Sequence, residues 1–350
     1  MREVTTSRKI PVTRDCFKSG DSAACAVQGA KVLALTGCLV VLLGGCARRP
    51  NVSQATDVHP GTPYLVVLGT AQDGGSPQVN SPIDHPARVD PQSRRLATCL
   101  GIVDPRSGKR WMIEATPDFR EQAWLLSRAE PPADVPASLD GIFLTHAHIG
   151  HYTGLMFLGH ESMGAQGMPV YAADRMAAFL TENGPWDQLV RYGNILLRPL
   201  VPSRRIALTD AISVTPFLVP HRQEYSEVLG FRIDGPSRSV LFIPDIDSWE
   251  QWEDLGRELV EEVRAVDAAY LDATFYDDNE IPGRDMSGFP HPRIVDTMAR
   301  LESLALQERR KVRFIHLNHT NPAQWRASEA RREIERRGFR VSVLGERLPL

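Results

Sequence analysis

Short apolar runs separated by turn residues begin at residue 64. The runs 64–69, 96–103 and 110–114 are each a few residues long and rich in branched or aromatic side chains, which is typical of strands. Residues 104–108 contain Asp, Pro and Gly and predict a turn between the last two runs. The run 141–144 has the same character and predicts another short, buried strand.

Helical patterns alternate with strands further along the chain. Residues 118–128 and 249–263 have helical spacing, and Asn321-Pro322 predicts the start of a last helix that ends at Gly338. Further helices are expected at 154–160, 175–180 and 293–306, and further strands at 169–172, within 195–219, and at 228–233, 239–243, 268–271, 312–317 and 339–344. In each half of the body, strands come first and then alternate with helices. This order predicts an α/β fold in which two sheets pack face to face with helices outside.

The first 61 residues differ in character from the rest. Six Lys and Arg side chains precede the apolar run 32–43, which is too short to span a bilayer comfortably and predicts a signal peptide over residues 1–45. Residues 46–61 are expected to form a polar tether, and residues 62–350 a single domain. An uncleaved anchor, or a start codon assigned too early, is the alternative.

Composition narrows the classes of partner. The net charge is −3, with 24% charged residues, which argues against a general nucleic-acid-binding protein. The basic stretch 326–337 alternates with glutamates and predicts a solvated helix face. We expect a small-molecule substrate as the partner, while the sequence leaves the oligomeric state open.

Three histidines fall within six residues directly after the strand 141–144. Alternate residues at a strand end point the same way, so His146 and His148 can face one point, and His151 can approach it from the following helical turn. Neutral imidazole is a common ligand for zinc and iron. The cluster therefore predicts a metal site.

Three later polar residues also stand at the ends of apolar strands: His221, Asp245 and His319. A polar group in such a place is costly unless something uses it. His316 competes with His319; the two differ by three positions and would face opposite sides of a strand, so the one nearer the loop, His319, is the prediction.

The stretch 145–151 resembles the metallo-β-lactamase superfamily signature His-x-His-x-Asp-His, with Gly150 at the aspartate position. The resemblance implies a four-layer αββα sandwich and a site for one or two zinc ions, with iron or manganese also open. It implies that His146, His148 and His221 hold one ion. His151 and His319 would hold the other, and Asp245 would bridge the two.

Four longer stretches resemble one branch of this superfamily, that of the B protein of pyrroloquinoline quinone biosynthesis. They are residues 68–78, 220–226, 242–250 and 316–322. In addition, Leu43-Gly44-Gly45-Cys46 resembles a bacterial lipobox. This implies lipidation of Cys46 and an exported lipoprotein, with Ala47 favouring the periplasmic face of the outer membrane and the lipid as its only attachment to a membrane.

The superfamily resemblance implies a metal-dependent hydrolase in which metal-activated water attacks an ester, lactone or phosphodiester. Asp245 would orient that water. Asp73 is a candidate for the carboxylate that Gly150 lacks, although a turn-forming Asp is the first interpretation. Glu224, Tyr225 and His291 are candidates for substrate contact. An iron-dependent oxygenase linked to quinone biosynthesis and a non-catalytic binding lipoprotein are the alternatives.

Overall fold

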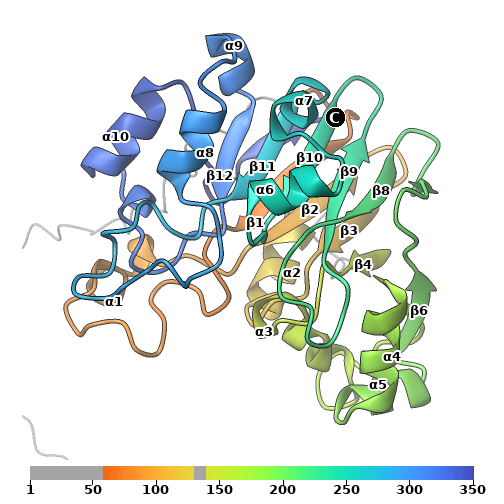
Figure 1. The fold of residues 1–350 in the computed structure, drawn as a ribbon. Coiled ribbons are helices and arrows are strands. Elements are labelled where there is room, and N and C mark those ends of the chain that lie inside the picture. The colour runs from red at the N-terminus through yellow and green to blue at the C-terminus, as the bar shows by residue number, and fades with distance from the viewer. Residues whose placement is uncertain (1–57, 130–138) are drawn as a thin grey trace, which may run out of the picture. The chain divides into compact units, whose positions relative to one another are not determined.

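Strands form two mixed sheets of seven strands each in the computed structural model (Figure 1). The structure describes residues 58–129 and 139–350, so the predicted signal peptide and most of the predicted tether lie outside the described residues. The first sheet has the order β14 (Arg347–Pro349), β1 (Tyr64–Gly69), β2 (Cys99–Asp104), β3 (Lys109–Ile113), β4 (Gly141–Phe143), β5 (Met168–Ala172) and β6 (Ile195–Pro199). The second has the order β13 (Arg340–Val341), β12 (Val312–Ile315), β11 (Ala268–Asp272), β10 (Ser239–Ile243), β9 (Leu229–Asp234), β8 (Ser213–Leu218) and β7 (Ile206–Ala207).

Each sheet is antiparallel on one side and parallel on the other. Strands β3 to β6 pair in parallel, and so do β10 to β13. The carboxyl ends of parallel strands meet at one edge of a sheet, and the loops there commonly carry functional groups. Both sheets therefore bring residues from distant parts of the sequence to one edge.

The helices are short, and several of them cover the outer faces of the two sheets. They are α1 (Pro86–Val89), α2 (Phe119–Ser127), α3 (Ile149–Tyr152), α4 (Asp174–Glu182), α5 (Trp186–Arg191), α6 (Trp249–Asp254), α7 (Leu259–Arg264), α8 (Ile294–Arg300), α9 (Leu306–Arg309) and α10 (Glu329–Arg336), with short 3-10 turns η1 (Pro91–Ser93), η2 (Thr153–Leu158) and η3 (Pro322–Gln324). Figure 1 shows α8 and α10 on the side of β12, and α4 and α5 on the side of β6. Among the described residues, no helix is long and apolar enough to cross a bilayer.

Three hydrophobic cores separate these layers. Along β1, Leu65 and Val67 enter the core between the sheets. Tyr64, Val66 and Leu68 enter the core between the first sheet and helices α2, α4 and α5. This alternation follows from the two-residue period of a strand. A third core lies between the second sheet and α6, α7, α8 and α10. Four layers result, which confirms the predicted αββα sandwich.

Several predicted helices are broken. The helix expected at 249–263 is two helices, α6 and α7, because Gly256 between them has a φ of +80°. Asn321 caps a 3-10 turn, and α10 begins only after Ser328, whose hydroxyl accepts a hydrogen bond from the N–H of Arg331. The helix expected at 154–160 is the 3-10 turn η2. Strand β14 and helix α5 were not expected.

Candidate metal centre

The first sheet delivers three histidines through the loop after β4. His146 and His148 follow the strand, and His151 lies in α3. The loop is fixed on both sides, since the N–H of Ala147 donates to the Ser226 hydroxyl and the N–H of Leu229 donates to the Thr145 carbonyl. His146 and His151 are each only 1% exposed. These two imidazoles therefore face the interior, whereas the side chain of His148 is 15% exposed.

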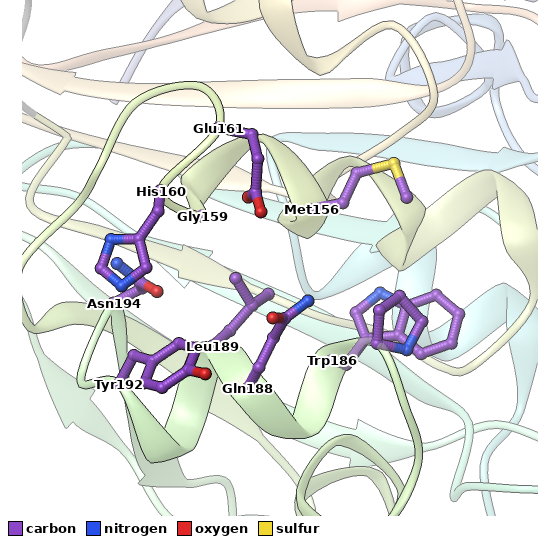
Figure 2. Close-up of a pocket in the computed structure, with 10 residues that line it drawn as sticks. Met156, Gly159, His160, Glu161, Trp186, Gln188, Leu189, Tyr192 and Asn194 are labelled. Carbon is purple, nitrogen blue, oxygen red and sulfur yellow. The ribbon is translucent and has the colours of Figure 1, made fainter. Parts of the chain in front are cut away.

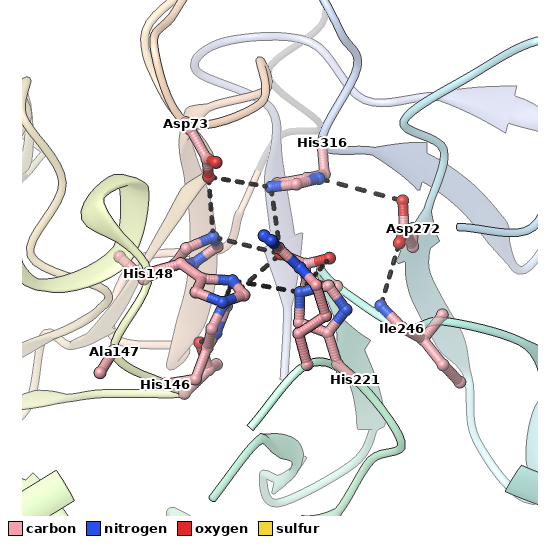
Figure 3. A network of polar contacts seen from close by, with 12 residues as sticks. Asp73, His146, Ala147, His148, His221, Ile246, Asp272 and His316 are labelled. Atoms are coloured by element: carbon pink, nitrogen blue, oxygen red, sulfur yellow. Dashed lines mark hydrogen bonds and ion pairs between the residues drawn. The ribbon is translucent and has the colours of Figure 1, made fainter. Parts of the chain in front are cut away.

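The second sheet delivers its polar groups in the same way. His221 follows β8, Asp245 follows β10 and His316 follows β12. All three are buried, and His316 is fully so. Figure 3 shows His221 and His316 on the side that faces His146 and His148. Two sheet edges thus meet in one cluster of titratable side chains.

One group of donor atoms consists of His146, His148, His221 and Asp245. The Nδ1 of His148 lies 2.9 Å from the Nε2 of His146 and 3.2 Å from the Nε2 of His221. The Nε2 of His221 is 3.3 Å from Oδ1 of Asp245. A tetrahedron of ligands at about 2.0–2.1 Å from zinc has edges of about 3.3–3.4 Å. These separations fit such a tetrahedron.

A second group consists of Asp73, His151, His316 and the same Asp245. The Nε2 of His151 lies 3.2 Å from Oδ1 of Asp73 and 3.5 Å from Oδ2 of Asp245. The Nε2 of His316 lies 3.7 Å and 3.8 Å from the same two oxygens. The edges again match a small cation, and Asp245 belongs to both groups.

Each histidine is held by its outer ring nitrogen. The Nδ1 of His151 lies 3.0 Å from Glu114, and the Nδ1 of His221 lies 2.6 Å from Asp247. The Nε2 of His148 lies 3.1 Å from Glu224. The Nδ1 atoms of His146 and His316 lie 2.8 and 3.0 Å from the hydroxyls of Thr145 and Thr274. A second partner of this kind fixes the ring and leaves the inner nitrogen free for a metal, as is usual for metal-ligating histidine.

Glu114 is the most deeply placed of these partners. It directly follows β3, is fully buried, and has a φ of +85°. Its carboxylate also accepts hydrogen bonds from the hydroxyl of Thr145 at 2.6 Å and from the N–H of Thr145 at 3.3 Å. It therefore holds His151 directly and His146 through Thr145.

Opposite charges stabilise one another within the cluster. Burial raises the pKa of Asp245, but the charges of His316, His221 and His291 outweigh it and hold that pKa well below its usual range. Burial lowers the pKa of His151, but Glu114 and Asp245 outweigh it and hold that pKa well above the usual range. Burial, followed by the neighbouring charge of His151, holds the pKa of His146 well below its usual range.

Four buried donor atoms at the cluster have no hydrogen-bond partner among the described residues. They are Oδ1 of Asp73, Nε2 of His151, Oδ1 of Asp245 and Nε2 of His316. An unsatisfied buried polar atom costs about 1–3 kcal/mol, so four in one place call for a common partner. Imidazole and carboxylate donors in two tetrahedral groups fit zinc or a related divalent ion.

The family model of the beta-lactamase superfamily domain matches residues 109–317, more than half of the chain. The chain belongs to this superfamily. The match covers all of the donors above except Asp73.

Curated relatives resemble the branch expected from the sequence. The coenzyme PQQ synthesis protein B (PqqB) of Rhizobium meliloti is 25% identical over 80% of this chain and 96% of its own length. That of Gluconobacter oxydans is 26% identical, with the same coverage. The predicted PqqB-like resemblance is therefore confirmed.

Two solved structures share the fold. Zinc-bound PqqB from Methylobacterium extorquens is 21% identical and covers 82% of this chain and 100% of its own, with a TM-score of 0.67. A diphosphatase of the PhnP family is 22% identical and covers 82% and 97%, with a TM-score of 0.56. At these identities both likenesses concern the fold alone.

His319 does not belong to the donor cluster. His316 occupies the place in the second donor group that was predicted for His319. Strand β12 ends at Ile315, and His316 takes a left-handed backbone conformation with a φ of +66°, which turns its ring into the cluster. The ring of His319 instead lies 2.9 Å from the hydroxyl of Ser81. The prediction of His319 as a ligand is wrong, because neither the strand end nor the backbone turn could be inferred from spacing.

The residues predicted to contact substrate lie at different depths. Glu224 is 47% exposed and pairs with His148, and Tyr225 is 62% exposed with its ring 5.3 Å from that of Phe179. The Nδ1 of His291 lies 2.8 Å from Asp272 and 3.1 Å from Asp245. Substrate contact by any of them stays a prediction.

His291 belongs to the polar network of the centre. Burial lowers its pKa, but the charges of Asp272 and Asp245 outweigh it and raise the pKa of His291 to about 10. Asp272 is fully buried, and it also accepts hydrogen bonds from the N–H of Ile246 and the hydroxyl of Thr274 (Figure 3). Asp272 and Glu114 are not among the residues predicted from the sequence, although each is a polar residue at the end of an apolar strand, the same pattern that predicts Asp245.

A separate pocket of about 170 Å³ lies between η2 and α5 (Figure 2). The rings of His160 and Tyr192 lie 5.2 Å apart on one side of it. Its lining is Met156, Gly159, His160, Glu161, Pro185, Trp186, Gln188, Leu189, Tyr192 and Asn194. None of these residues belongs to the donor groups.

Proposed function

We propose that this protein is a metal-dependent hydrolase with two metal ions, zinc being the first candidate. The observation that carries the proposal is that two groups of four donors share Asp245. Paired ions about 3.5–4 Å apart are typical of hydrolytic centres that act on esters and phosphoryl groups. We therefore propose an ester, lactone or phosphodiester as the substrate class.

His146, His148 and His221 would hold one ion, and Asp73, His151 and His316 the other, with Asp245 between them. When bound, such ions lower the pKa of a coordinated water to about 7 and polarise the substrate oxygen. Asp245 would orient the water.

Protein groups keep Asp245 in place for this role. The Nδ1 of His291 forms its hydrogen bond with Asp272 at 2.8 Å and lies in ion-pair contact with Oδ1 of Asp245 at 3.1 Å. The N–H of Ile246, next in the chain, donates to Asp272 at 3.0 Å. His291 and Asp272 would thus act as positioning residues for the shared carboxylate.

The test combines metal content with turnover. We expect purified protein to carry two equivalents of metal and to hydrolyse at least one member of a panel of esters, lactones and phosphodiesters. His146→Ala and Asp245→Asn should each lower both quantities. His160→Ala is a matched control, since His160 lies in the separate pocket. Unchanged metal content in both site variants would refute the proposal.

The curated relatives favour a second candidate, a role like that of PqqB in coenzyme PQQ synthesis. A histidine-rich centre with few carboxylates also suits Fe(II) in oxygenases. Iron-loaded protein that consumes oxygen in the presence of a tyrosine-like substrate would support this candidate. Hydrolysis that proceeds equally well without oxygen would support the first.

We also propose that the protein is an exported lipoprotein anchored at Cys46, on the strength of the lipobox-like sequence. Radiolabelled fatty acid should then be incorporated by the full chain and not by Cys46→Ser. Incorporation by neither chain would refute the anchor without affecting the proposed chemistry.

A further inference from the structure

Gly150 lies inside the histidine motif, in α3, at a point of very close approach. A Cβ atom built on Gly150 would lie 2.2 Å from Oδ1 of Asp73, 2.5 Å from its Cα and 2.7 Å from its Cγ. Contacts below about 3.0 Å are not tolerated by real Cβ atoms. The collision involves the backbone of Asp73 as well as its side chain, so rotation of Asp73 alone cannot relieve it.

The carboxylate of Asp73 thus fills the space beside the backbone of residue 150. Its Oδ1 points at His151 and His316, at 3.2 and 3.7 Å, and within residues 58–129 and 139–350 it has no hydrogen-bond partner. These are the neighbours that an aspartate of the superfamily signature at position 150 would be expected to join. The structure supplies that carboxylate from another loop.

The loop that carries Asp73 is fixed at both ends. The N–H of Gln72 donates to the carbonyl of Leu317, next to His316, at 2.9 Å, and the N–H of Gly75 donates to the carbonyl of Gln72 at 2.8 Å. The backbone carbonyl of Gln72 thus closes the turn. Within the part of the chain that the structure describes, no backbone N–H donates to Oδ1 of Asp73. The turn-forming role first considered for Asp73 therefore does not account for its carboxylate.

We propose that Asp73 is the carboxylate ligand of the second metal ion, and that it replaces the aspartate which the superfamily signature places at position 150. Positions 73 and 150 then exclude each other: a side chain at 150 displaces Asp73, and Gly150 is what allows Asp73 to reach the ion. This inference rests on the proposed two-ion function and assigns the origin of one ligand.

The first experiment measures bound zinc per chain in wild type and in Asp73→Asn, which keeps the shape of the side chain. We expect two equivalents in wild type and one in Asp73→Asn, with affinity at the second position lowered by more than about a hundredfold, beyond what loss of an outer partner costs. Asp84→Asn, an exposed carboxylate on the same segment, should keep two.

The second experiment adds the smallest side chain at the glycine. Gly150→Ala should lose the second zinc equivalent although no ligand has been removed, and the visible spectrum of the cobalt-substituted protein should lose the bands of one site. Gly288→Ala is the matched control, because a Cβ there meets nothing within 4 Å. Circular dichroism establishes whether the variants are folded. If Gly150→Ala does not fold, the zinc content of Asp73→Asn alone tests whether Asp73 is a ligand.

The outcomes separate this inference from the proposed function. Two equivalents in wild type and two in Asp73→Asn would overturn Asp73 as a ligand and leave the two-ion centre standing. A single equivalent in wild type that Asp73→Asn retains would overturn both. Loss of one equivalent in both Asp73→Asn and Gly150→Ala would establish the exclusion between the two positions.

Discussion

Glu114→Gln is the substitution for which the structure makes the sharpest prediction. The change preserves volume and removes the charge of a fully buried carboxylate that accepts three hydrogen bonds, one from His151 and two from Thr145. A glutamine amide carries one acceptor and one donor group. Whichever way it is oriented, its NH2 faces at least one existing donor.

The size of the effect follows from these contacts. Loss of hydrogen bonds to a buried charged acceptor costs about 1–3 kcal/mol of the free energy of unfolding. Loss of an outer partner of a metal-ligating histidine lowers metal affinity by about tenfold to a hundredfold, or about 1.4–2.7 kcal/mol. His151 contacts Glu114 directly, whereas His146 is reached only through the Thr145 hydroxyl. The affinity for the second ion should therefore fall more than the affinity for the first.

Competition with a chromophoric chelator measures the two zinc affinities, and urea unfolding of the metal-free protein measures stability separately. We expect the weaker of the two sites in Glu114→Gln to be the one that contains His151. Glu121→Gln, an exposed change on α2, is the control. A loss of stability with both zinc affinities unchanged would show that Glu114 supports only the fold, and the reasoning about His151 would be refuted.

Three further predictions use other parts of the structure. Asp247→Asn removes the charged partner 2.6 Å from Nδ1 of His221 and should weaken the first ion by about tenfold to a hundredfold in the same titration; an effect confined to the second ion would contradict the assignment of His221. His316→Ala should release one zinc equivalent, whereas His319→Ala should release none; the reverse result would restore the prediction from sequence. Burial raises the pKa of Glu280 to about 7, against the hydrogen bonds it accepts, so the folded state binds more protons than the unfolded state between about pH 4.5 and 7. The free energy of unfolding should therefore fall across this range as pH rises, by at most about 3 kcal/mol for this group, and urea unfolding of Glu280→Gln should lack that contribution; equal pH slopes in both proteins would rule it out.

Features that follow from strand ends could be predicted from the sequence. His146, His148, His221 and Asp245 each follow a short apolar run, and the runs identify strands whose carboxyl ends converge. The alternation of strands and helices likewise predicts the layers. These inferences succeed because burial dictates the local pattern.

Features that depend on exact backbone conformation could not be predicted. His316 enters the cluster because of one residue with a φ of +66° directly after β12, and spacing alone favoured His319. Asp73 is brought in by the pairing of Gln72 with Leu317, two residues 245 positions apart in the chain. Gly256 ends a helix that periodicity alone would continue.

The donors of the centre are divided between the two halves of the sandwich. Asp73, His146, His148 and His151 belong to the first sheet, and His221, Asp245 and His316 to the second. A bound cation would therefore crosslink the two sheets at this edge, in a chain whose described part contains no disulfide. Its binding free energy would add to the free energy that holds the two sheets together. Chelation should accordingly lower the melting temperature. It should also make the loops that carry the donors susceptible to protease before either sheet unfolds.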